Sequence, residues 1–224
     1  MHDEIETLLD SFLTNLENET KKIARIGLID FTKTTTEGFF SDKIRTIFAT
    51  YKKQLDEFQI KVNRDRNIVL LPHLFELVIS TLTREFFMNY PNRNFSVRME
   101  MHLKVTNKQR VNIPDITILE NSKKIAIIEL KWQLKLNDFK SEIERREKFS
   151  DFLYFTLLYW NQTRTVIDKM IANKCKWVYS INPYTKISAM KKGMDANQLK
   201  YIESYLDVNN SIEQIFNNIL SHKM

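Results

Sequence analysis

Two runs rich in β-branched residues lie close together in the sequence, at residues 111–118 and 125–131. A short polar segment, residues 120–124, separates them. Two apolar runs joined by a few turn residues are typical of a β-hairpin, and a hairpin with two buried strands needs further elements to cover it. The segment from residue 111 to residue 133 therefore predicts the centre of the fold.

The hairpin brings ionisable residues to one end of two apolar strands. If the turn is centred near Ser122, antiparallel pairing places Asp115 opposite Glu129. Side chains alternate between the faces of a strand, so Glu129 and Lys131 share one face. Two acidic groups and one basic group are thus expected to converge at one place.

Such a group of side chains suits the hydrolysis of phosphodiesters. Mg²⁺ is a hard cation that one or two carboxylates hold together with waters and phosphate oxygens. Asp115 and Glu129 are the candidate metal ligands, and Lys131 is the candidate for orienting the attacking water or stabilising charge on the phosphate. The alternative is an ordinary cluster of salt bridges on a sheet.

The residues Pro114-Asp115 followed by Glu129-Leu130-Lys131 resemble the motif of the PD-(D/E)XK nuclease superfamily, which includes restriction endonuclease-like folds and archaeal Holliday-junction resolvases. The resemblance covers the motif and an αβββαβ pattern over about residues 70–182, and it leaves the flanks out. It implies an α/β fold with a mixed central sheet flanked by helices, together with Mg²⁺ as cofactor and Mn²⁺ as a possible substitute. Helical additions are expected at both termini.

Three further polar residues are candidates for the same site. A third helix is predicted from Pro72 to about Met88, and the resemblance implies that the helix before the sheet often supplies another acidic ligand. Glu76 is the candidate and Glu85 the reserve, although Glu76 would also interact favourably with the helix N-terminus. Gln133 shares the face of the lysine motif, where it would contact phosphate or a metal-bound water, or only cap the strand end.

The remaining elements are predicted from hydrophobic periodicity. Gly27 is expected to end the first helix. A domain boundary is placed near residue 67, giving a helical region 1–66 and a core 67–224, with one continuous domain as the alternative. The expected helices are 3–24, 41–58, 137–160, 166–172, 196–206 and 211–221, and the expected further strands are 95–105 and 175–181.

Composition narrows the function further. The chain of 224 residues carries a formal charge of +6, which favours a polyanionic partner such as DNA. Its three glycines are too scattered for a phosphate-binding loop, and its one cysteine, Cys175, fits a reducing cytoplasm. No signal peptide or membrane span is apparent, so a cytoplasmic protein is expected.

Two basic segments are candidates for binding nucleic acid. Lys52 and Lys53 lie on the exposed face of the second predicted helix, and Lys191 and Lys192 lie in a loop near the C-terminus. Charged helix faces are more often simply solvated, and that alternative stays open.

These observations predict a Mg²⁺-dependent nuclease acting on DNA, most simply an endonuclease. Alternatives are a structure-selective Holliday-junction resolvase, an RNA-directed nuclease, a catalytically inactive nucleic-acid-binding protein, and a purely structural helical partner protein. A homodimer is expected, because cutting both strands of a duplex in one encounter needs two sites. Its interface would use the aromatic residues of segment 149–160 and the apolar stripe of the C-terminal helices (Leu199, Ile202, Ile212, Ile215, Phe216).

Overall fold

A computed structural model describes residues 2–33, 39–66, 70–99, 114–162, 166, 169–170, 175, 177–181, 193–200 and 212–221. Its helices and strands are mixed along the chain, which confirms the predicted α/β class. The chain forms two compact units, residues 1–123 and 124–224, and each is described by itself below. The predicted domain boundary near residue 67 stays a prediction.

The strands form one five-stranded mixed sheet with the order β1-β2-β3-β4-β5. β1 (Phe95–Met99) pairs antiparallel with β2 (Ile116–Glu120), which confirms the predicted pairing of these two segments over the described residues. β4 (Tyr154–Gln162) runs parallel to β3 (Lys123–Leu134) on one side and to β5 (Val178–Ser180) on the other.

The loop between β2 and β3 consists of two residues, Asn121 and Ser122. Both have positive φ angles, 47° and 65°. Two-residue hairpin loops favour this backbone conformation because it matches the twist of the flanking strands, and asparagine adopts it more readily than most residues. The turn therefore falls at the predicted place, with Glu120 in one strand and Lys123 in the next.

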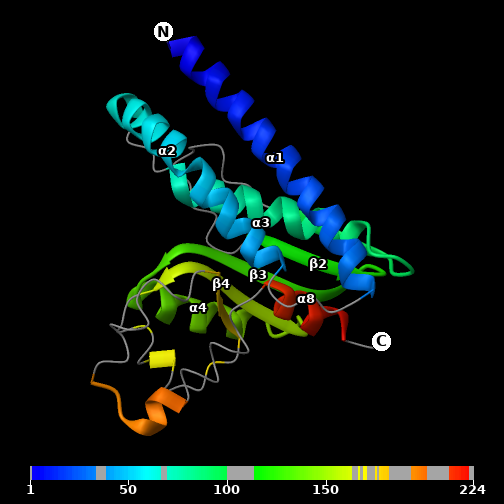
Figure 1. Cartoon of the computed structure of the whole chain (residues 1–224). Helices are drawn as coiled ribbons and strands as arrows, with labels where there is room; N and C mark the ends of the chain where they lie inside the picture. The colour runs from blue at the N-terminus through cyan, green and yellow to red at the C-terminus, as the bar shows by residue number, and fades with distance from the viewer. Residues whose placement is uncertain are drawn as a thin grey trace. The chain divides into compact units, whose positions relative to one another are not determined.

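The first unit contains three helices: α1 (His2–Lys33), α2 (Phe39–Arg66) and α3 (Leu70–Met88) (Figure 1). They pack through aromatic and charged side chains. Phe86 of α3 is the centre of this packing, with ring centroids 5.1 Å from Phe31 of α1 and 5.6 Å from Phe40 of α2. The first turn of α3 contains Pro72, as predicted, because proline needs no intrahelical hydrogen-bond partner there.

Gly27 does not end the first helix, contrary to the sequence prediction. It lies inside α1, where a Cβ atom would collide with the ring of Phe40 and would come within 2.9 Å of the ring of Phe39. The absence of a side chain therefore serves the close approach of α2 to α1, and packing overrides the low helix propensity of glycine.

The second unit places α4 (Leu136–Lys148) between β3 and β4 in the chain and against these strands in space (Figure 1). Two parallel neighbours cannot be joined by a tight turn, so the chain must cross over the sheet, and α4 is this crossover. Its apolar residues Leu136, Phe139 and Ile143 pack in a core with Leu157 and Tyr159 of β4.

The C-terminal helix of the second unit, α8 (Ile212–Leu220), is tied to β5 by a hydrogen bond. The amide of Asn218 donates to the hydroxyl oxygen of Tyr179 at 2.7 Å, and burial raises the pKa of that tyrosine. The predicted helix at 211–221 is confirmed within the described residues, and helical residues 196–200 agree with the helix predicted before it.

The prediction of one helix over residues 137–160 was wrong. The helix ends at Lys148, and residues 154–162 form β4. A buried parallel strand has an almost continuous apolar sequence, which periodicity alone does not distinguish from a buried helix. β5, which contains Tyr179, runs parallel to β3, which contains Glu129. The two strands are not neighbours, because β4 lies between them.

Candidate functional site

Glu129, the acidic residue of the Glu-Leu-Lys motif, is completely buried in β3 and is paired with Arg145 of α4. Nη1 of Arg145 donates to Oε2 and Nη2 donates to Oε1, both at 2.8 Å. The side chain of Glu129 is 1% exposed and that of Arg145 17%. This fork-to-fork geometry is the strongest form of a charge-assisted hydrogen bond, and it compensates for the burial of the carboxylate.

Lys131, the basic residue of the motif, contacts the same helix one turn away. Its Nζ lies 3.2 Å from Oε1 of Glu142, and Nη1 of Arg145 lies 3.4 Å from that oxygen. Lys131 is 30% exposed, whereas the Glu142 side chain is 3% exposed. Since Glu129 and Lys131 both reach α4, they lie on one face of β3, as the alternation of side chains predicted.

We call these four residues, Glu129, Lys131, Glu142 and Arg145, the β3–α4 ion cluster. Two carboxylates and two cations make it formally neutral. Charges of opposite sign alternate from Lys131 through Glu142 and Arg145 to Glu129. The guanidinium carbon of Arg145 also lies 5.9 Å from the ring centroid of Phe149. In the described part of the chain, Oε2 of Glu142 is buried and accepts no hydrogen bond.

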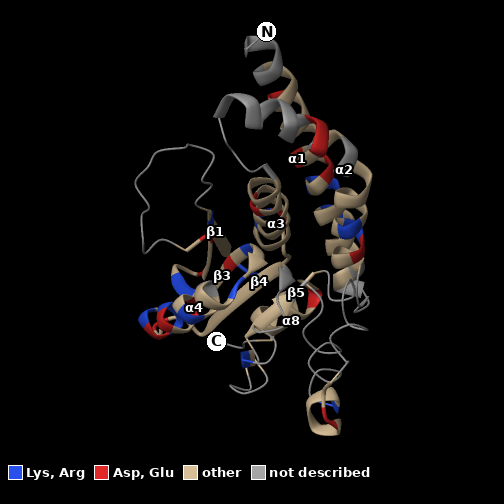
Figure 2. Ribbon diagram, turned by 90° about the vertical axis from the view of Figure 1, so that its left-hand side faces the viewer, with Lys and Arg blue, Asp and Glu red and all other residues tan. Residues whose placement is uncertain are grey.

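The acidic charges of α4 occur among many basic ones, as Figure 2 shows by colour. The helix contains lysine, arginine and glutamate at most of its positions after Phe139. Arg145, Arg146 and Lys148 lie in the last turn, where positive charge interacts favourably with the helix dipole. Glu142 and Arg145 are the charged residues of α4 that contact Lys131 and Glu129 of β3.

The other predicted metal ligands belong to the first unit. Asp115 is half-buried and directly precedes β2. Its pairing with Glu129 stays a prediction. Glu76 of α3 lies 3.9 Å from Nδ1 of His73, one turn earlier on the same helix. Its reserve, Glu85, contacts Arg25 of α1 at 3.5 Å.

The remaining predicted residues fall outside the ion cluster or outside the description. Gln133 is exposed on β3, opposite Asn161 of β4. Lys52 and Lys53 lie on α2, but their side chains are outside the described part of the structure, and Lys191 and Lys192 are outside it altogether. The predictions for these residues remain predictions.

Carboxylates are the ligands that Mg²⁺ prefers, so the donor chemistry of the cluster suits a divalent cation. However, no group of three or more histidine, cysteine, aspartate or glutamate residues among the described positions is arranged to hold a metal ion. Both oxygens of Glu129 accept hydrogen bonds from Arg145. A divalent cation that binds Glu129 would therefore share this carboxylate with the guanidinium or displace it.

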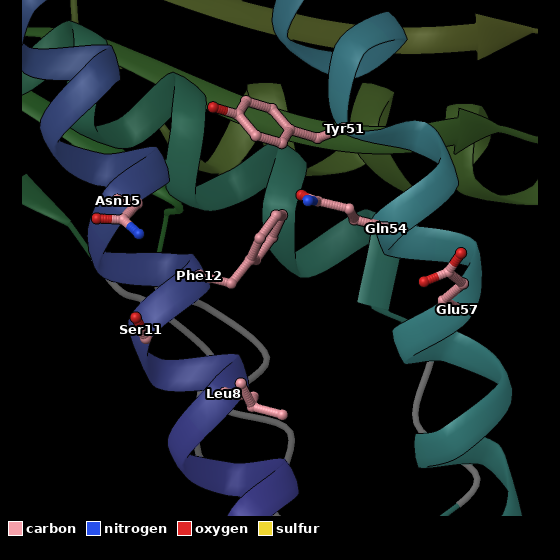
Figure 3. A pocket seen from close by; sticks show the side chains of 7 residues that line it. All are labelled: Leu8, Ser11, Phe12, Asn15, Tyr51, Gln54 and Glu57. Atoms are coloured by element: carbon pink, nitrogen blue, oxygen red, sulfur yellow. The ribbon is translucent and has the colours of Figure 1, made fainter.

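A separate pocket of about 400 Å³ lies between α1 and α2 (Figure 3). It is formed by Leu8, Ser11, Phe12 and Asn15 of α1 and by Tyr51, Gln54 and Glu57 of α2. The hydroxyl of Tyr51 donates to Glu19 at 2.6 Å, and this hydrogen bond raises the pKa of the tyrosine. Among the described residues that line the pocket, Glu57 is the one carboxylate and none is basic, so this lining is not suited to binding phosphate.

Sequence reasoning missed Glu142 and Arg145, although a signal for them existed. Leu136, Phe139 and Ile143 mark the face of the helix that packs on the sheet. Glu142 lies three residues after Phe139 and therefore near that face, and Arg145 follows Glu142 at the favourable spacing of three. A charged pair on the buried side of a crossover helix is the pattern that indicates partners on the sheet.

Comparison of the chain with protein-family models, with curated proteins and with solved structures gave no match.

Proposed function

We propose that this protein is a Mg²⁺-dependent nuclease that hydrolyses phosphodiester bonds in DNA. In this proposal Asp115 and Glu129 hold the ion, Lys131 orients the attacking water, and Glu76 completes the acidic set. The observation that carries the proposal is the position of Glu129 and Lys131 on one face of the central strand β3, where both contact the crossover helix α4.

The order of elements around this strand supports the proposal. From α3 to β4 the chain runs helix, strand, strand, strand, helix, strand, which is the αβββαβ order that the motif's resemblance to the PD-(D/E)XK superfamily implies. The antiparallel pair β1–β2 and the parallel pair β3–β4 make the sheet mixed, as that resemblance also implies. A restriction endonuclease-like core is therefore part of the proposal.

The charge and the exposure of each residue would determine its role in the reaction. A bound divalent ion would supply Lewis acidity toward the phosphate oxygens. Lys131 has the exposed fraction needed to meet solvent and substrate, while Glu142 holds its ammonium group in place. Glu129, being buried, is protected from direct competition by bulk water and would present its carboxylate in a fixed orientation.

One observation favours a second candidate, a nucleic-acid-binding protein without catalytic turnover. Arg145 neutralises Glu129 through both carboxylate oxygens, as a structural ion pair would. In that case the net charge of +6 would still attract a polyanion, and binding would weaken as salt is added.

Cleavage assays with duplex DNA, Holliday-junction DNA, single-stranded DNA and RNA, in Mg²⁺ and in EDTA, separate the two candidates. We expect Mg²⁺-dependent cleavage by the native protein. Glu129→Gln and Asp115→Asn should each reduce it by about a hundredfold or more, since groups that act directly in catalysis contribute about 10²–10⁴-fold. Affinity for the nucleic acid should change little, because it depends on dispersed phosphate contacts.

Glu144→Gln is the matched control, because this exposed glutamate lies on α4 beside the ion cluster without belonging to it. Its cleavage rate should equal that of the native protein, and circular dichroism should show that every variant is folded. Binding without cleavage of any of the four substrates in Mg²⁺ or Mn²⁺ would favour the second candidate. Full cleavage by Glu129→Gln would exclude the proposed site.

A further inference from the structure

We propose that two copies of this chain pair through α1, with the two helices running antiparallel about a twofold axis near Asn18. Apolar side chains near one end of each helix then meet those near the other end of its partner, and the acidic half of each helix meets the basic half. This pairing does not depend on the proposed nuclease activity, because it uses no residue of the β3–α4 ion cluster.

Exposed apolar side chains lie on one side of α1. Among the described side chains of this helix, Leu8, Ile26 and Ile29 are the large apolar ones that are exposed. Leu8 and Ile26 are 18 residues apart, which is about five turns of 3.6 residues, and Ile29 follows Ile26 by about one turn. The three side chains therefore form a stripe along one side of the helix. Aligned exposed apolar side chains indicate a surface that another element covers.

The apolar stripe is symmetric about the middle of α1. The helix contains 32 residues, from His2 to Lys33, so its middle is next to Asn18. Leu8 lies ten residues before Asn18, and Ile26 and Ile29 lie eight and eleven residues after it. An antiparallel copy centred on Asn18 therefore brings Leu8 level with the space between Ile26 and Ile29 of the other copy.

The pocket between α1 and α2 lies at the Leu8 end of the stripe. Leu8 and Phe12 point from α1 toward α2, and Tyr51 lines the opposite side (Figure 3). In the antiparallel arrangement, Ile26 and Ile29 of the other copy come level with this pocket of about 400 Å³. Each copy contributes the same two apolar side chains and the same pocket, so a single twofold axis forms both contacts.

The charge of α1 changes sign near its middle. Residues 2–20 contain six acidic residues and no lysine or arginine, whereas residues 21–33 contain four basic residues and one acidic residue. In a parallel pair the acidic half of each helix would face the acidic half of the other copy, which is unfavourable. In an antiparallel pair each acidic half faces a basic half. The charge pattern therefore selects the antiparallel direction.

The helix dipole does not account for this charge pattern. Its effect on side chains is confined to about the first and last turns, whereas Asp10 and Lys22 are exposed and lie at least two turns from either end. Asp10 comes beside Arg25 of the other copy when the axis passes near Asn18. The Arg25 side chain is 68% exposed, although it also contacts α3, so it is accessible to a second carboxylate.

The centre of the stripe is polar and suits a contact with a defined register. Ser11, Asn15 and Asn18 are exposed there, and a single asparagine in a contact between helices fixes their register. Glu17 and Glu19, which flank the axis, contact Arg84 of α3 and Tyr51 of α2 within the same chain. Their charges are therefore directed toward the body of the first unit.

Cross-linking with a short bis-maleimide tests the direction of pairing on the full chain. Ser11→Cys and Arg25→Cys place thiols at the same level of an antiparallel pair, whereas two Ser11→Cys thiols are roughly 20 Å apart along the helix. We expect a cross-linked dimer when the two variants are produced together, and little from either variant alone. Native Cys175 should not react, because it is buried and burial raises the pKa of its thiol.

Glu144→Cys, which places an exposed thiol on α4, is the control for random collisions and should give no cross-linked product. Cross-linking of Ser11→Cys alone as fast as in the mixture would show a parallel pair and overturn the proposal. Absence of product from the mixture would also overturn it, whether light scattering gives the mass of a monomer or of a dimer.

Asp10→Lys tests the contribution of charge. This change replaces an exposed ion pair by two like charges at two places in each dimer, so the dissociation constant should rise about tenfold. Glu144→Lys makes the same change of net charge on α4 and should leave the constant unchanged. The difference should shrink at high salt, which screens exposed charges. Equal dissociation constants for the two variants at low salt would refute the antiparallel arrangement of charges.

Discussion

Two buried glutamates of this protein are each held by a forked arginine, and they lie in different units. Besides Glu129 with Arg145, Glu120 of β2 accepts two hydrogen bonds of 2.5 Å from Arg93, just before β1. These bonds raise the pKa of the Arg93 guanidinium. Burial of a lone carboxylate is very unfavourable, so each arginine is required by its glutamate.

Arg93→Ala should therefore lower the free energy of unfolding by about 3 kcal/mol, since removing one partner of a buried ion pair typically costs about 3–5 kcal/mol. The loss is increased by the packing of the guanidinium over the ring of Phe95, 4.7 Å from its centroid. Urea denaturation followed by circular dichroism measures the change. Arg98→Ala on the exposed side of β1 is the control and should be near native, and equal stability of the two variants would contradict this account.

For the helices and strands, packing can override the conformational preference of a residue. Gly27 is an unfavourable residue for a helix interior, yet α1 continues through it because the ring of Phe40 occupies the space of a side chain. Conversely, Tyr154–Gln162 could continue the preceding helix by composition, but this segment forms a strand because it pairs with β3 and β5.

Gly27→Ala should destabilise the protein by about 1–2 kcal/mol, although alanine is the better helix former by about 1 kcal/mol, because inserting a methyl group into a packed contact costs about 1–3 kcal/mol. Thermal unfolding measures the shift. Asn18→Ala, at an exposed position of the same helix, gains the propensity without the collision and should be native or slightly more stable. A Gly27→Ala protein more stable than native would disprove the contact with Phe40.

At the scale of the whole molecule, burial changes the argument for a dimer. The aromatic residues Phe155, Tyr159 and Trp160 and the apolar residues Ile212 and Phe216 are buried within one chain, so they are not available as an interface. Among the described helices, none is long and apolar enough to span a membrane. Among the described side chains of α1, three large apolar ones are exposed, Leu8, Ile26 and Ile29, each at 54%.

A homodimer stays our prediction, with the exposed apolar side chains of α1 as its interface. Light scattering at micromolar concentration should give a mass near twice 26.8 kDa. The double substitution Ile26→Glu/Ile29→Glu, which places charge on α1, should give a monomer, whereas Lys140→Glu, which makes the same change of net charge at an exposed position of α4, should leave the mass unchanged. A mass of 26.8 kDa for the native protein, with and without DNA, would refute the dimer.

The hairpin turn, the α/β class and the shared face of the motif residues were predictable from local sequence. Turn chemistry at Asn121 and the alternation of side chains along residues 125–131 are local properties, and they do not depend on the rest of the fold. The first turn of α3 at Pro72 was predictable for the same reason.

The neighbours of these elements, in contrast, depend on long-range packing. Whether residues 154–162 are helix or strand depends on hydrogen bonds to strands distant in sequence, which no local pattern encodes. In the same way, the charged residues of α4 look equivalent along the chain, and only the crossover that lays this helix on the sheet selects Glu142 and Arg145 as partners of Lys131 and Glu129. Local sequence thus set the chemistry of the motif, and long-range packing set which charges meet it.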